Sequence, residues 1–77
     1  MTMTFVFMKI KAGFLEHVLN ILSEMEGVRE AYPVTGGIDI IVKIEGESIE
    51  TISKKILGEI HKIDGVERTA THIVVPL

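Results

Sequence analysis

No cysteine occurs among the 77 residues, and its absence excludes several classes of site. Thiolate metal centres, thiol nucleophiles and metal-transfer sites built on a C-x-x-C turn all need this residue. A chain without disulfides fits a reducing cytoplasm, where we expect this protein to be located. A chain this short buries a limited fraction of its surface and usually needs additional stabilisation. Because 47% of the residues are hydrophobic, we expect oligomerisation to supply it.

Basic residues are few and scattered. Lys and Arg number 8 against 11 Asp and Glu, the net charge is −3, and no basic block exists. Sheet surfaces that read nucleic acid need aromatic side chains among basic ones, and only Phe5 and Phe7 are candidates. The apolar N-terminal run is interrupted by Lys9 and Lys11 and has no basic region before it. We therefore expect no direct nucleic-acid binding, no signal peptide and no membrane span.

The sequence also lacks the usual signatures of catalysis. It has no glycine-rich phosphate loop with a basic residue and no evident acid–base pair. His17, His61 and His72 are far apart and show no metal-ligand spacing with carboxylates. We therefore predict no metal, no cofactor and no enzymatic activity.

The distribution of apolar residues predicts six elements. Alternation predicts strands and a three-to-four spacing predicts helices. Ser48 is the expected N-cap of the second helix, Gly27 and Gly65 are expected to end the two helices, and Pro33 favours an edge strand. The predicted strands cover residues 4–11, 28–34, 38–44 and 66–75, and the predicted helices cover 14–25 and 49–63.

An internal repeat supports one fold. Residues 26–30, Glu-Gly-Val-Arg-Glu, are echoed by residues 64–68, Asp-Gly-Val-Glu-Arg, each after an apolar helix end. Two βαβ-like halves predict an α+β, ferredoxin-like βαββαβ sandwich in a single domain spanning residues 1–77. Both helices would cover one face of a four-stranded antiparallel sheet.

The other face of that sheet should be apolar. If Val66, Ala70 and Val74 point to the core, Thr69 and Thr71 lie on the uncovered face together with Ile73 and Val75. A patch of this size exceeds what monomers usually expose, so we expect a homodimer packed sheet to sheet; the alternative is a sparse, merely exposed patch. The expected interface residues are Phe5, Phe7, Ile41, Ile73 and Val75.

One stretch points to function. Residues 34–44 join a glycine turn to the most apolar strand of the chain, and Asp39 stands just inside that strand. We find no role in folding for a carboxylate at that position. The stretch Val-Thr-Gly-Gly-Ile-Asp-Ile-Ile-Val-Lys (residues 34–43) is similar to the V-x-G-x-x-D-h-h-h-K hairpin (h, apolar) of the RAM domain. Residues 63–74 are similar to the h-x-G-V-x-x-T-x-T-x-h-V ending of the same domain.

Together these motifs resemble the effector-sensing RAM domain of the Lrp/AsnC transcription factors. The resemblance covers nearly the whole chain and implies an amino-acid sensor that dimerises through its sheets and assembles into rings such as octamers. Its ligand would lie at subunit boundaries. The glycines would offer backbone amides, Asp39 would receive the α-ammonium group, and the threonine hydroxyls could bind a carboxylate or the hairpin backbone. The implied ligand-binding residues are Thr35, Gly36, Gly37, Asp39, Thr69 and Thr71.

The resemblance also suggests partners. Lrp/AsnC regulators carry a helix-turn-helix, which finds no room before the first predicted strand, so the chain resembles a stand-alone sensing domain. It would act in homo-oligomers or in mixed assemblies with full-length Lrp/AsnC regulators.

Other interpretations stay open. The glycines could form a plain hairpin turn, Asp39 could pair across the dimer with Lys43 or Lys9, and Thr69 and Thr71 could be purely structural. At the level of function, the runner-up is an ACT-like allosteric subunit of an amino-acid biosynthetic enzyme, with its ligand glycine in Ala12-Gly13-Phe14. A small dimeric ferredoxin-like enzyme is a weaker alternative.

Overall fold

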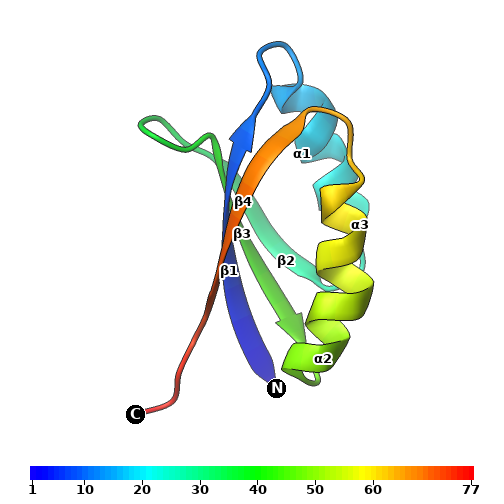
Figure 1. Cartoon of the computed structure of the whole chain (residues 1–77), viewed down its shortest axis with the longest axis vertical. Coiled ribbons are helices and arrows are strands. Elements are labelled where there is room, and N and C mark those ends of the chain that lie inside the picture. The colour runs from blue at the N-terminus through cyan, green and yellow to red at the C-terminus, as the bar shows by residue number, and fades with distance from the viewer.

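A computed structural model describes all residues, 1–77, as a four-stranded antiparallel sheet with its helices on one side (Figure 1). The strand order is β2-β3-β1-β4. The α+β sandwich predicted from the sequence is confirmed. The elements are β1 (Thr2–Ile10), α1 (Leu15–Glu24), β2 (Val28–Pro33), β3 (Ile40–Gly46), α2 (Ile49–Thr51), the π-helical segment η1 (Ile52–Leu57), α3 (Gly58–His61) and β4 (Val66–Ile73).

The second helix is one continuous rod made of α2, η1 and α3, since the residues at its two internal junctions keep right-handed helical dihedrals. Ser48 begins it as predicted, and its hydroxyl accepts a hydrogen bond from the Thr51 amide at 3.1 Å. Pro33 ends β2, which is indeed an edge strand.

The core lies between the sheet and the helices. It contains the inward faces of β1 and β3 and the apolar stripes of both helices. The strand residues with period two therefore pack against the helix residues with helical spacing, as predicted. Its buried members are Val6, Met8, Ile10, Val18, Leu22, Ile40, Val42, Ile44, Ile52, Ile56, Ile60 and Ile63.

The two repeated motifs hold the halves of the chain together in a reciprocal way. Gly27 and Gly65 follow the two helices with φ of +93° and +97°, a region that favours glycine. The Gly27 carbonyl accepts a hydrogen bond from Glu45 N–H at 3.0 Å, and the Gly65 carbonyl accepts one from Lys11 N–H at 2.7 Å. Each glycine therefore binds the end of a strand that belongs to the other half.

Each motif also carries a β-bulge at the residue after its valine. In β2, Val28 pairs with Ile44 and Glu30 with Lys43, which leaves Arg29 as the extra residue. In β4, Val66 pairs with Ile10 and Arg68 with Lys9, which leaves Glu67 as the extra residue. An extra residue inverts the side-chain alternation of everything that follows it.

The bulge at Glu67 makes the predicted face of β4 wrong. Val66 packs against the core as expected, but Thr69, Thr71 and Ile73 then pair with Met8, Val6 and Thr4 on the helix side. Ala70 and His72 pair with Phe7 and Phe5 and therefore lie on the uncovered side. Val75 lies beyond the end of β4 and is 69% exposed. Neither Ile73 nor Val75 has the place in the uncovered face that the sequence interpretation gave it.

One core position carries an unused hydroxyl. Thr4 is fully buried, and its Oγ1 has no hydrogen-bond partner. Because an unsatisfied buried hydroxyl is costly, we expect Thr4→Val to stabilise the fold by about 1 kcal/mol, a rise in Tm of about 4–8 °C. Thermal unfolding of the variant tests this. Thr69→Val is the matched control, since its hydroxyl has a partner, and equal effects of the two substitutions would contradict the prediction.

Candidate functional site

The loop between β2 and β3 projects from the sheet on the side that the helices leave bare (Figure 1). Thr35, Gly36 and Gly37 are exposed in it, and Gly36 has a φ of +117°. A Cβ at either glycine would meet no atom within 4 Å. The N–H groups of residues 35–38 donate none of the backbone–backbone hydrogen bonds. The loop therefore presents a run of amides without a backbone partner, and successive free amides can receive an anionic group.

Asp39 fixes the base of this loop. Its backbone N–H donates to the Met8 carbonyl at 2.8 Å, and its carbonyl accepts from Val34 N–H at 2.9 Å. Its carboxylate Oδ2 accepts a hydrogen bond from Ile10 N–H at 2.8 Å and lies 3.5 Å from Lys9 Nζ. The carboxylate thus has a role in folding, contrary to expectation. It accepts the hydrogen bond of the Ile10 N–H of β1, which lies past the last residue pair between β1 and β3, Met8 and Ile40. The pairing with Lys9 occurs within one protomer.

The same contacts keep Asp39 ionised. The hydrogen bond from Ile10 N–H, followed by the charge of Lys9, holds the pKa of the carboxyl below its usual value of 3.8. The carboxylate is 29% exposed, and only Oδ2 is engaged in these contacts. Its other oxygen is available to a cationic group arriving from solvent.

Replacing this carboxylate should make stability less dependent on pH. Because the folded-state pKa is depressed, Asp39 contributes stability above pH 3.8, and this contribution is lost as the pH falls through the lower folded-state value. We expect Asp39→Ala to lower Tm at about pH 7 and to differ much less from the parent at about pH 2. Thermal unfolding at both pH values measures this, with Asp64→Ala as an exposed, unpaired control. A Tm difference that stays constant would contradict it.

The predicted threonines do not meet the hairpin within one protomer. Thr69 and Thr71 are on β4, two strands away from β3, and on the opposite face of the sheet from the exit of the loop. Thr69 Oγ1 lies 2.9 Å from Nε2 of His61 on α3. His61 and His17 are exposed, and His72 lies on the bare side of the sheet.

The bare side of the sheet is called the open face below. Register places Phe5, Phe7 and Ile41 there, as predicted. The open face also contains Tyr32 and His72, which sequence reasoning missed because the bulges change the face to which the residues of β2 and β4 point. Tyr32 pairs with Ile41, and the His72 ring stacks on Phe7 with centroids 4.8 Å apart. One row across all four strands therefore consists of Tyr32, Ile41, Phe7 and Ala70.

Charged groups border that row on the β2 side. Glu30 Oε2 lies 3.3 Å from Lys43 Nζ, and Glu30 Oε1 accepts a hydrogen bond from the Tyr32 hydroxyl. These contacts, Tyr32 first, lower the pKa of Glu30, and the same bond raises the pKa of Tyr32.

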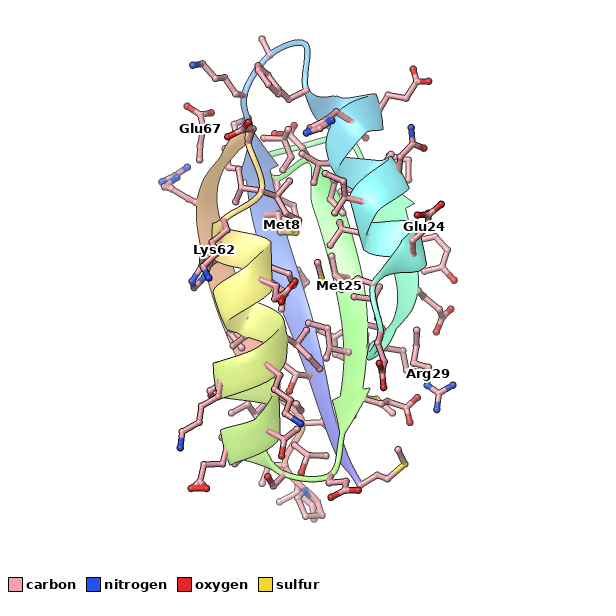
Figure 2. All side chains as sticks on the ribbon, turned by 90° about the vertical axis from the view of Figure 1, so that its right-hand side faces the viewer. Met8, Glu24, Met25, Arg29, Lys62 and Glu67 are labelled. Carbon is pink, nitrogen blue, oxygen red and sulfur yellow. The ribbon has the colours of Figure 1, made fainter.

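A cleft of about 740 Å³ lies on the helix side, between the end of α1 and the second helix. Figure 2 shows Met25 between the two helices and Lys62 on the second of them. Its lining includes both positively charged lysine and negatively charged glutamate side chains. No pattern in the sequence indicated this cleft, because its lining residues come from segments far apart in the chain.

Two other kinds of site are absent from the structure. No group of three or more His, Asp or Glu side chains is placed to hold a metal ion. No helix has the length and apolarity needed to span a bilayer.

Comparison with known proteins assigns the family. The sequence model described as "Lrp/AsnC ligand binding domain" matches residues 3–76. The HTH-type transcriptional regulator FL11 of Pyrococcus abyssi is 37% identical over 73 residues, which cover 95% of this chain and 48% of FL11. FL11 of Pyrococcus furiosus is 34% identical over the same shares. The chain thus spans about half the length of the curated relatives it matches.

Solved structures agree. The Pyrococcus horikoshii protein PHS023 superposes with a TM-score of 0.90 at 32% identity, covering 100% of this chain and 93% of that one. Escherichia coli AsnC superposes with a TM-score of 0.89 at 27% identity, covering 99% of this chain and 52% of AsnC. With its fold, its hairpin and these matches in agreement, the chain belongs to the Lrp/AsnC family, as a ligand-binding domain of that family.

Proposed function

We propose that this domain is a non-enzymatic amino-acid sensor that acts in transcription regulation as part of an oligomer. The observation that carries the proposal is the hairpin, where free backbone amides at residues 35–38 lie directly before an ionised, half-buried Asp39. An α-amino acid presents a carboxylate and an ammonium group, and this pair of features is complementary to both.

The bound geometry follows from the contacts already described. The ligand carboxylate accepts hydrogen bonds from the loop amides, which the two glycines leave sterically open. The ligand ammonium group approaches the Asp39 oxygen that is not held by Ile10 N–H. Thr69 and Thr71 can contribute hydroxyls only from a neighbouring subunit, because the sheet separates them from the hairpin of their own chain.

A second copy of the chain is the proposed cover of the open face. The row of Tyr32, Ile41, Phe7 and Ala70 gives two sheets an apolar contact surface, which two-fold symmetry would bury on both protomers at once. Such a dimer, and rings built from dimers, would place the hairpin at subunit boundaries. Ligand binding regulates assembly only if the ligand binds one oligomeric state more tightly than another.

Partners follow from the relatives. The curated proteins that this chain matches are HTH-type transcriptional regulators of about twice its length. We propose that the domain exchanges into assemblies with such full-length regulators in the cytoplasm and so biases their DNA-binding arms. The family match favours this role over the ACT-like subunit, and no observation favours an enzyme.

Isothermal titration calorimetry against the twenty amino acids tests the sensor. We expect at least one to bind the parent protein, and Gly37→Val to abolish this binding by filling the space before the loop amides. Because a Cβ at Gly37 meets no atom within 4 Å and φ there is not positive, the variant should keep the Tm of the parent. Gly58→Val, on the second helix, is the matched control for binding, because a Cβ there also meets no atom within 4 Å and φ is −60°. No heat with any amino acid would refute the proposal.

A further inference from the structure

Two cations lie directly opposite each other near the hairpin. Lys9 on β1 pairs with Arg68 on β4, on the open face. Like charges directly opposite in a sheet destabilise it. Arg68 takes part in none of the ion pairs of the chain, and neither does Glu67, the extra residue of the bulge beside it. The bulge itself creates this juxtaposition, because it turns Arg68 to the same face as Lys9.

One carboxylate contacts the lysine of this pair. Asp39 Oδ2 lies 3.5 Å from Lys9 Nζ, but the same oxygen also accepts the hydrogen bond from Ile10 N–H. Lys9 is 38% exposed, so it retains access to solvent while paired. Lys9, with Asp39 in contact on one side and Arg68 opposite it on β4, is the centre of a cluster of these three side chains with a net charge of +1, beside the loop that offers free amides.

We propose that the ligand of this site is an acidic amino acid, whose side-chain carboxylate pairs with Arg68 and Lys9. The inference rests on the proposed function and specifies its ligand. An amino acid with two carboxylates and one ammonium group has a net charge of −1, which neutralises the cluster. Its α-carboxylate meets the loop amides, its ammonium group meets Asp39, and its second carboxylate relieves the repulsion between Lys9 and Arg68.

Other ligand classes fit less well on the same grounds. A neutral amino acid leaves the Arg68 guanidinium without a counter-ion, and a basic one adds a third cation to the pair. Arginine presents planar, fork-shaped donors that match a carboxylate in bidentate geometry, so Arg68 is suited to distinguish a carboxylate from its amide.

Calorimetry with L-glutamate, L-aspartate, L-glutamine, L-asparagine and L-lysine at low salt tests the inference. We expect at least one acid to bind about tenfold more tightly than its amide, and lysine to bind least tightly. Arg68→Gln should bring acid and amide to within about threefold of each other. Arg68→Lys should restore part of the preference. Lys62→Gln, on the helix side of the molecule, is the matched control and should leave it unchanged (Figure 2).

A second measurement separates recognition from stability. Since Arg68 is opposed to Lys9, Arg68→Gln should keep or raise the Tm of the ligand-free protein. Added NaCl should weaken acid binding in the parent more than in Arg68→Gln, because salt screens charged pairs. Preferential binding of neutral or basic amino acids would overturn the inference and leave the proposed sensor intact. Binding of no amino acid would overturn both.

Discussion

Phe7→Glu is expected to leave a folded monomer. Phe7 stands in the middle of the apolar row on the open face, between Ile41 of β3 and Ala70 of β4. An unpaired carboxylate buried at that position, once in each protomer, costs several kcal/mol, so we expect the dimer dissociation constant to rise by at least about a thousandfold. Light scattering at several protein concentrations measures the effect, and circular dichroism verifies that the fold is retained.

Two variants control for this substitution. Phe7→Leu keeps an apolar side chain in the row and should keep the dimer. Lys62→Glu adds the same negative charge on the helix side and should also keep it (Figure 2). A parent protein that stays monomeric at every concentration would contradict the proposed dimer, as would a Phe7→Glu variant that dimerises as the parent does.

Gly65→Ala is expected to cause the largest loss of stability of any single methyl group added to a turn of this chain. A Cβ at this position would lie 2.7 Å from Cδ2 of Phe14 and closer still to that residue's Cβ. The residue also has a φ of +97°, which costs an L-amino acid about 1–2 kcal/mol before any clash. With displacement of Phe14 added, we expect a total of about 3 kcal/mol or more, measured by urea unfolding.

Gly13→Ala isolates the backbone contribution to this loss. Its φ is +88°, and a Cβ there meets no atom within 4 Å, so only the conformational cost of about 1–2 kcal/mol applies. Equal losses in the two variants would show that the contact between Gly65 and Phe14 does not matter. The Gly65 turn also accepts the Lys11 N–H bond, so we expect Gly65→Ala to disturb the end of β1 as well.

The sequence sufficed for the elements and the layers because both depend on local pattern. The alternation in β3 is strong, with isoleucine and valine on the core face, and glycines mark both helix ends. The face of β4 is different. Its alternating residues are threonines on one side and alanine and histidine on the other, a contrast too weak to set a register. The bulge at Glu67, defined only by pairing with β1, inverted the assignment.

The candidate site was also predicted only in part. The glycine loop and Asp39 were found from their spacing, and both lie where a ligand can reach them. The partner of Asp39 could not be found, since the Ile10 amide is 29 residues away and nothing at Ile10 signals a missing acceptor. Arg68 was missed because its approach to Lys9 is another product of the bulge.

The strand order makes the two repeated halves interdependent for folding. The first half supplies β1 and β2 and the second supplies β3 and β4, yet β3 lies between β1 and β2, and β1 lies between β3 and β4. Neither half contains two strands that are neighbours in the sheet. A chain severed in the exposed loop between β2 and β3 would therefore yield two fragments that are each unstructured in isolation and regain their shape only by associating with each other.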